Sequence, residues 1–98
     1  MTINKISDNQ NLTVALAGRL DTVTAPEFEA ELKASIGGVT MLTLDFAELE
    51  YISSAGLRVL LSAQKIMNQQ GKMVIKNVND TIMEVFEITG FAEVLNVE

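Results

Sequence analysis

Short apolar runs alternate with segments of helical periodicity along this 98-residue chain. The runs have the length and the alternation of strands, whereas the segments between them repeat apolar residues every three or four positions. A strand followed by a helix and a neighbouring strand normally forms a right-handed crossover between parallel strands. The order therefore predicts an α/β fold, a small mixed β-sheet with helices packed mainly on one face.

The expected element order is β-β-α-β-α-β-α-β. We expect strands at residues 3–7, 12–17, 41–46, 73–75 and 94–97, and helices at 24–36, 54–70 and 80–89. The run at 41–46 is nearly continuous in apolar residues, which is typical of a central strand covered on both faces. Asp45 within it has two interpretations, a buried polar anchor or a group facing solvent.

The helix boundaries carry recognisable signals. Thr24 and Glu27 have the spacing of a capping box, and Pro26 is tolerated in a first turn. The pair Gly37-Gly38 is expected to end the first helix, and Gly71 and Gly90 the next two.

Composition excludes several classes of function. The chain has no Cys and no His, so it offers no disulfide, no thiolate or imidazole metal ligand, and no Ser/His or Cys/His catalytic pair. We therefore expect a protein that is not an enzyme and uses no metal or cofactor. Because 98 residues are too few to give each of two domains a core, we expect a single domain over residues 1–98. The formal net charge of −6 disfavours binding to nucleic acid and to anionic lipid surfaces. Without a signal peptide or an apolar stretch long enough to span a bilayer, the expected location is the cytoplasm.

The segment Tyr51-Ile52-Ser53-Ser54-Ala55-Gly56-Leu57 joins a strand region to a predicted helix. Ser54 is well placed as the N-cap, accepting a hydrogen bond from the backbone N–H of Gly56 or Leu57. In the structural interpretation, Ser54 is only a cap and Gly56 allows close packing. In the functional interpretation, Ser54 carries a phosphate, which would meet the free N–H groups and the positive end of the helix dipole. Phosphorylation would add about −1.5 to −2 charges.

This segment also resembles the motif of the STAS domain of bacterial anti-sigma factor antagonists. That motif is an apolar pair followed by Asp-Ser-Ser/Thr-Gly-Leu. The resemblance extends to Gly18-Arg19-Leu20-Asp21, to Leu44-Asp45-Phe46 and to Phe86-Glu87-Ile88-Thr89-Gly90-Phe91, in the family's order. It therefore runs along nearly the whole chain.

The resemblance implies a phosphorylation-gated binding module. The family's phosphoacceptor falls on Ser54, its following hydroxyl residue on Ala55, and its preceding Asp on Ser53. Ser53 is thus a departure from the family pattern and a second candidate acceptor. The implied partners are an anti-sigma factor serine kinase and a PP2C-like phosphatase. The candidate partner-binding residues are Asp21, Ser53, Ser54, Ala55, Gly56, Leu57 and Arg58.

Two of these residues have more than one interpretation, and so has the proposed switch. Asp21 is either part of the surface that meets the kinase or a loop or cap aspartate. Arg58 is either a partner of a carboxylate or phosphate, or a solvated side chain. Unphosphorylated, the module would bind the kinase and release a sigma factor. The alternatives are an interaction module that lacks the phospho-switch, and a sensor that uses the helix N-terminus as an anion site.

Overall fold

The computed structural model describes residues 1–98. Its elements are β1 (Thr2–Asp8), β2 (Asn11–Leu20), α1 (Ala25–Ser35), β3 (Met41–Ile52), α2 (Ser54–Gln70), β4 (Lys72–Lys76), α3 (Asp80–Thr89) and the 3₁₀ helix η1 (Phe91–Glu93). The sheet has the order β1-β2-β3-β4; β1 is antiparallel to β2, and β2, β3 and β4 are parallel to one another. The expected mixed sheet is confirmed.

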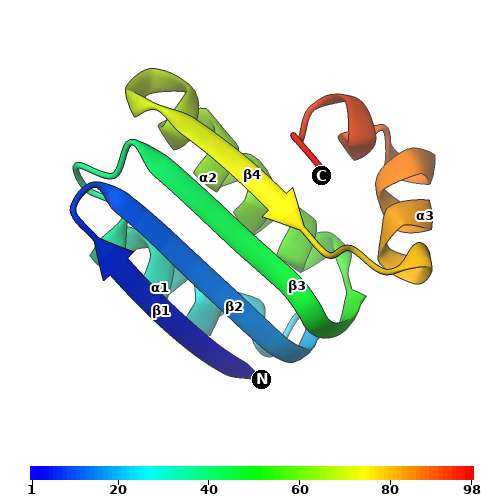
Figure 1. The fold of residues 1–98 in the computed structure, drawn as a ribbon. Helices are drawn as coiled ribbons and strands as arrows, with labels where there is room; N and C mark the ends of the chain where they lie inside the picture. The colour runs from blue at the N-terminus through cyan, green and yellow to red at the C-terminus, as the bar shows by residue number, and fades with distance from the viewer.

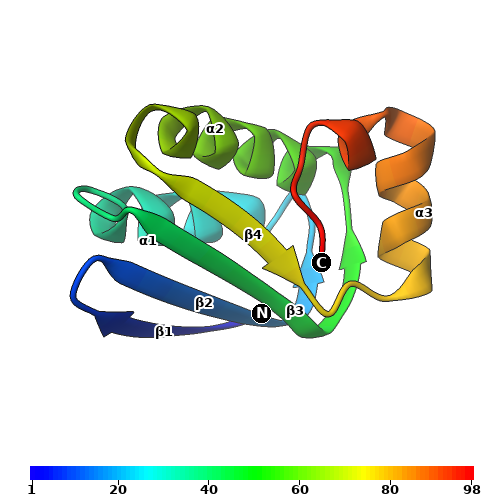
Figure 2. The ribbon, with the colours of Figure 1, turned by 45° about the horizontal axis from the view of Figure 1, so that its top comes forward.

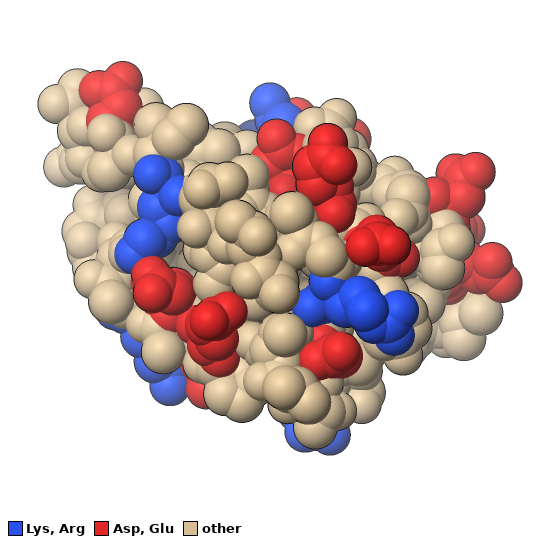
Figure 3. Space-filling model, turned by 90° about the horizontal axis from the view of Figure 1, so that it is seen from below, with Lys and Arg blue, Asp and Glu red and all other residues tan.

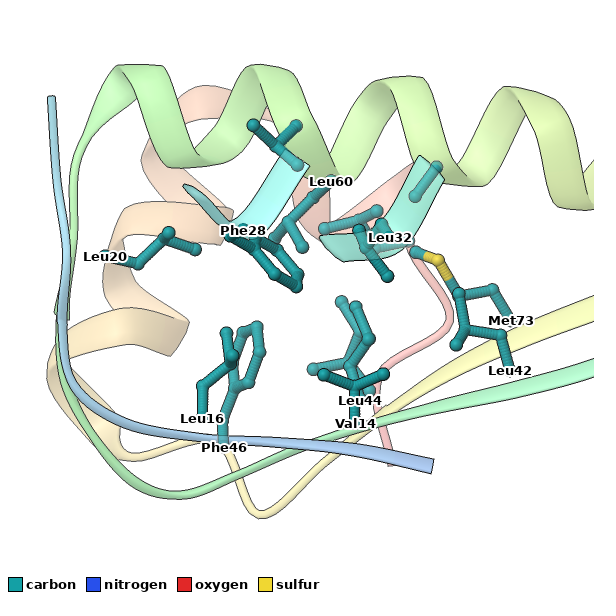
Figure 4. Packing of buried hydrophobic residues seen from close by; sticks show 14 of the residues in the cluster. Val14, Leu16, Leu20, Phe28, Leu32, Leu42, Leu44, Phe46, Leu60 and Met73 are labelled. Carbon is teal, nitrogen blue, oxygen red and sulfur yellow. The ribbon is translucent and has the colours of Figure 1, made fainter. Parts of the chain in front are cut away.

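The helices α1 and α2 cover one face of the sheet (Figure 1), whereas α3 stands beyond the end of the strands (Figure 2). The hydrophobic core fills the space between this face and the two helices. Figure 4 shows Leu16 and Phe46 rising from the strands toward Phe28 of α1 and Leu60 of α2. All four side chains are almost completely buried, so burial of apolar surface fixes both helices to the sheet.

The face of the sheet that α1 and α2 do not cover contradicts one expectation about β3. In β3, buried Leu42, Leu44 and Phe46 alternate with half-buried Met41, Thr43 and Asp45. The prediction that this strand is covered on both faces is therefore wrong, because α1 and α2 pack on one side only. In β4, by contrast, Met73, Val74 and Ile75 are all buried.

The strand β3 is twelve residues long and extends six residues past the predicted end. Its pairing with β2 shifts register twice, between Ala15 and Ala17 and between Gly18 and Arg19. Each shift places an additional β3 residue opposite β2, as in a β-bulge. Asp45 Oδ1 supports the first irregular region by accepting hydrogen bonds from Ala47 N at 3.0 Å and from Asn77 Nδ2 at 2.9 Å. Asp45 is therefore an anchor, but a half-buried one and not the buried anchor of the first interpretation.

The predicted final strand at residues 94–97 is not formed. Gly90 adopts a left-handed conformation with φ of 81°, and the chain continues into η1. Only one parallel bridge, between Ile75 and Val97, joins this segment to β4. The chain turns through η1 and buries Leu95, which leaves too little extended backbone for a strand. No helix in the structure has the length and apolar character needed to cross a membrane.

Candidate functional site

The junction between β3 and α2 forms the centre of the candidate site. Ser53 has an extended backbone, with φ of −101° and ψ of 176°, and its N–H donates to the Leu20 carbonyl of β2 at 2.9 Å. Its Oγ accepts the Gly56 N–H at 3.5 Å, and its carbonyl accepts the Leu57 N–H at 3.0 Å. Ser53 is therefore the N-cap, and the prediction that Ser54 holds this position is wrong. The cause is that β3 stays extended through Ser53.

Ser54 is the first residue of α2 and is exposed. Its hydroxyl has no hydrogen-bond partner within the chain, whereas the Ser53 hydroxyl is engaged in the cap. The first N–H groups of a helix have no partner inside it and form the positive end of its dipole. An anionic group on the Ser54 hydroxyl would lie beside this end.

The structure separates the predicted partner-binding residues by accessibility. Ser54 and Arg58 are exposed, and Asp21, Ser53 and Ala55 are half-buried. Gly56 and Leu57 are buried, so they act on this surface through packing and not by direct contact. A Cβ at Gly56 would lie 2.8 Å from both Ile52 Cγ1 and Leu20 Cγ, which supports the close-packing interpretation of this glycine.

Asp21 organises the turn between β2 and α1. Its Oδ1 accepts hydrogen bonds from Val23 N at 3.0 Å and Thr24 N at 3.1 Å, and from the Thr24 hydroxyl at 3.2 Å. The bond from Thr24 N is the main cause that lowers the pKa of Asp21, with help from Val23 N, the Thr24 hydroxyl and the charge of Arg19. Asp21 therefore caps the first turn leading into α1.

Thr24 does not make the side-chain cap that the capping-box spacing predicted. Its hydroxyl points back into the turn, donating to the Arg19 carbonyl at 2.8 Å and accepting the Asp21 N–H at 2.9 Å. The carboxylate of Asp21 accepts the Thr24 N–H, which is the group that the Glu27 side chain would accept in a capping box, so the spacing with Glu27 is not used.

Sequence reasoning missed a pair beside the site. Arg19 and Tyr51 are opposite each other in the β2–β3 register, and the Arg19 guanidinium carbon lies 4.4 Å from the centroid of the Tyr51 ring. This is a cation–π contact. Arg19 Nε also lies 3.9 Å from Asp21 Oδ2. The signal was absent from the sequence because the two bulges set this register.

Sequence reasoning also missed an open groove of about 200 Å³ between the N-terminal ends of α1 and α2, here called the α1–α2 groove. It is lined by Thr22, Ala25, Pro26, Glu29, Ala55, Arg58 and Val59. Ala55 follows Ser54 directly, so the groove begins beside the candidate acceptor. Such a groove depends on how two helices pack and has no signature in the sequence.

Charge is mixed on the face of the molecule that Figure 3 shows, where separate small groups of basic side chains lie among acidic ones. No cluster of three or more His, Cys, Asp or Glu side chains is arranged to hold a metal ion. The chemistry that the site offers is therefore an exposed hydroxyl, a helix N-terminus and an adjacent groove.

The profile of the STAS domain family matches residues 2–98. BtrV of Bordetella bronchiseptica, whose name places it among the anti-sigma factor antagonists, is 39% identical over 99% of this chain and 84% of its own length. The anti-sigma-B factor antagonist of Listeria monocytogenes is 29% identical over 96% of this chain and 84% of its own length.

Solved structures show the same fold. The unphosphorylated form of the anti-sigma factor antagonist SpoIIAA has a TM-score of 0.78 at 20% identity, covering 99% of this chain and 87% of its own. The phosphorylated form of Bacillus SpoIIAA has a TM-score of 0.76 at 20% identity, covering 99% and 91%. The match to the family profile along nearly the whole chain agrees with the likeness to BtrV and with the fold. This chain is therefore a STAS domain of the anti-sigma factor antagonist family.

Proposed function

We propose that this protein is an anti-sigma factor antagonist whose binding to an anti-sigma serine kinase is controlled by phosphorylation of Ser54. Unphosphorylated, it binds the kinase and so releases the sigma factor that the kinase holds. Phosphorylated, it dissociates, and a PP2C-like phosphatase restores the binding form. Its effect on transcription is then indirect, through protein contacts in the cytoplasm.

The observation that carries this proposal is the difference between two adjacent serines. The Ser53 hydroxyl caps α2, whereas the Ser54 hydroxyl is exposed and makes no hydrogen bond within the chain. A kinase can therefore reach Ser54 without breaking the fold. Ser53 also keeps the capping function that an Asp at this position would perform, because both are favoured N-cap residues. The departure from the family motif thus leaves the acceptor geometry intact.

The same geometry explains how a phosphate would act as a switch. A phosphate on Ser54 brings about −1.5 to −2 charges to the first turn of α2, where free N–H groups and the helix dipole stabilise it. The fold therefore tolerates the modification. The partner meets a larger and more negative surface on a chain whose net charge is already −6. A loss of only about 1.4 kcal/mol weakens binding tenfold, so a single phosphate is sufficient.

The relatives support this cycle. The BtrV and Listeria proteins are named as anti-sigma factor antagonists, and SpoIIAA is described in both unphosphorylated and phosphorylated forms. A protein that exists in both forms is what a phosphorylation switch requires. The names support the class of partner, and the accessibility of Ser54 supports the position of the modification.

The decisive experiment mixes the purified protein with ATP and an anti-sigma serine kinase from the same organism. Mass spectrometry should find one phosphate, located on Ser54. The Ser54→Ala variant should bind the kinase but take no phosphate, and Ser54→Asp should bind weakly. Ser53→Ala is the matched control, since it removes the neighbouring hydroxyl and should still be phosphorylated.

Two results would contradict the proposal. Phosphate on Ser53 alone would move the acceptor by one residue. A wild-type protein that binds the kinase without being modified, and whose Ser54→Asp variant binds equally well, would indicate an interaction module without a phospho-switch. An anion sensor would instead show thermal stabilisation by inorganic phosphate or a nucleotide in the absence of any kinase.

A further inference from the structure

The C-terminal part of the chain carries acidic side chains and no basic one. After Lys76 the sequence contains five Asp or Glu residues and no Lys or Arg. On α3, Asp80, Glu84 and Glu87 are spaced four and three residues apart, so they form one stripe along the helix surface. All three are exposed, and none takes part in an ion pair of the structure. The outer side of α3 therefore carries only negative charge.

This arrangement of charge is unfavourable for the helix itself. Like charges three or four residues apart on a helix repel each other. Glu87 lies in the last turn of α3, where the helix dipole favours basic residues, and no basic residue is present there. The helix is held by other means: Asn79 Oδ1 accepts the Ile82 N–H at 2.8 Å, and Ile82 and Phe86 are fully buried. Charges that lower stability and have no partner within the chain point to a partner outside it.

Apolar side chains lie beside the acidic stripe. Ile88 is 77% exposed and follows Glu84 by four residues, so the two side chains are neighbours on the helix surface. Val94, which directly follows η1, is 51% exposed, and Val85 on α3 is half-buried. Ile88 and Val94 are two of the four exposed large apolar side chains of the chain, and only six residues separate them. Exposed apolar surface that is gathered in one place beside charged groups is typical of an interaction site.

The turn between Ile88 and Val94 is ordered. Gly90 ends α3 with a φ of 81°, and the N–H groups of Val94 and Leu95 both donate to the Phe91 carbonyl, at 3.0 and 2.8 Å. Leu95 is buried and so fixes the end of this turn to the core. A partner would therefore meet a surface that is already formed, which lowers the entropic cost of binding.

The charge of this surface determines which partner fits it. Nucleic acids and anionic lipids have the same sign of charge and would be repelled, whereas a basic protein segment is complementary. The acidic stripe and the apolar side chains both follow the axis of α3, so a helix lying along α3 can contact both. Amphipathic helices bind in this way, through apolar residues three and four positions apart.

We propose that α3 and η1 form a second protein-binding surface, which receives a basic amphipathic helix of a partner protein. Apolar residues of that helix pack on Ile88 and Val94, and its Lys or Arg side chains pair with Glu84 and Glu87. None of these four residues belongs to the junction between β3 and α2, so binding here does not require the Ser54 hydroxyl.

The test uses a synthetic peptide of Leu and Lys as the probe, with Leu at the spacing i, i+3, i+4 and i+7 that makes a helix amphipathic. A scrambled peptide has the same composition and charge but no apolar face. Calorimetric titration into the whole chain measures both affinities, and amide NMR spectra locate the site. We expect the amphipathic peptide to bind more tightly and to shift the amide signals of α3 and η1.

One pair of variants tests the apolar contact. Ile88→Ser removes the most exposed apolar side chain of the surface and should weaken binding of the amphipathic peptide by about tenfold. Ile6→Ser is the matched control, because Ile6 is 69% exposed on β1, and it should bind as wild type does.

A second pair tests the charge contact. The double variant Glu84→Gln, Glu87→Gln should bind the amphipathic peptide more weakly, and its difference from wild type should shrink as salt is added. The control Asp8→Asn, Glu27→Gln removes two acids that are also exposed and outside the ion pairs, and it should bind nearly as wild type does. In thermal unfolding the α3 double variant should be at least as stable as wild type, because it removes repulsion between like charges. Weaker binding by a protein of unchanged or higher stability identifies a binding role.

Four results would overturn the proposal. Equal affinity for the scrambled peptide would show attraction by net charge alone. Control variants that lose as much affinity as the α3 variants, or amide shifts outside α3 and η1, would place the contact elsewhere. Self-association that Ile88→Ser abolishes would make a second copy of this chain the occupant.

Discussion

The α-carbon of Gly56 faces Leu20 so closely that an added Cβ would lie 2.8 Å from the Leu20 Cγ. Leu20 is fully buried, so it has little freedom to move away. The close approach joins the first turn of α2 to the end of β2, next to the hydrogen bond from Ser53 N to the Leu20 carbonyl. The position of Ser54 thus depends on packing beneath it.

We predict that Gly56→Ala destabilises the protein, although alanine is the better helix former. Overpacking at a buried site costs about 1–3 kcal/mol, which outweighs a helix-propensity gain of about 1 kcal/mol. Urea unfolding measures the change. Gly37→Ala is the matched control, because a Cβ there meets nothing within 4 Å, and it should be neutral or slightly stabilising. Equal stability of Gly56→Ala and wild type would contradict the packing role.

The two adjacent serines should differ in their effects on stability and modification. Ser53→Ala removes the N-cap of α2 and should lower the free energy of unfolding by about 0.5–1 kcal/mol. Ser54→Ala should leave stability nearly unchanged and abolish phosphorylation. Ser53→Asp should restore or increase stability, since a carboxylate at the N-cap also meets the helix dipole. If Ser54→Ala were the more destabilising change, Ser54 would be the cap after all.

Much of the fold could be predicted from the sequence because periodicity records which face of each element is buried. The alternation around Val14 and the four-residue spacing of Phe28 and Leu32 point to the core that the structure shows. The same patterns predicted the position of α2 and its end at Gly71. The buried face of an element follows from its own sequence pattern, so it can be predicted without knowing which elements pack against it.

Other features depended on contacts that no local pattern records. Ser53 and Ser54 have the same N-cap preference, and only the extended backbone of β3 decides between them. The prediction of a last strand was wrong because Val97 is the one residue of this segment that pairs with β4. The groove and the Arg19–Tyr51 contact arise from helix packing and bulged register, which are properties of the assembled fold.

Asp21 should act mainly through its hydrogen bonds, because the distance between Arg19 Nε and Asp21 Oδ2 is as long as 3.9 Å. An Asn side chain offers the same Oδ1 acceptor to Val23 N and Thr24 N but lacks the charge that these donors favour, so Asp21→Asn should be only slightly less stable than wild type and bind the kinase normally. Asp21→Ala removes the acceptor altogether and should be less stable than Asp21→Asn. Calorimetric titration with the kinase tests the binding. Weakened binding by a fully stable Asp21→Asn protein would favour direct contact between this carboxylate and the partner.

Asp45 should make the stability of the protein sensitive to acid. The hydrogen bond from the Asn77 side chain, then the Ala47 N–H and the charge of Lys76, lower the pKa of Asp45 below its ordinary value of 3.8. A lowered pKa in the folded state contributes stability above the unfolded pKa, and this stability is lost as the pH falls through the folded pKa. Acid should therefore weaken the junction between β3 and the loop after β4.

We predict that Asp45→Asn is less stable than wild type at neutral pH and that the difference narrows as the pH falls below 3.8. Urea unfolding across this pH range measures it, and the other carboxylates cancel because both proteins share them. Asp8→Asn is the matched control: Asp8 is exposed in β1 and its side chain makes no hydrogen bond, so this substitution should change the free energy of unfolding little. A difference in the free energy of unfolding between wild type and Asp45→Asn that stays constant down to acid pH would show that the ionised carboxylate does not stabilise this junction.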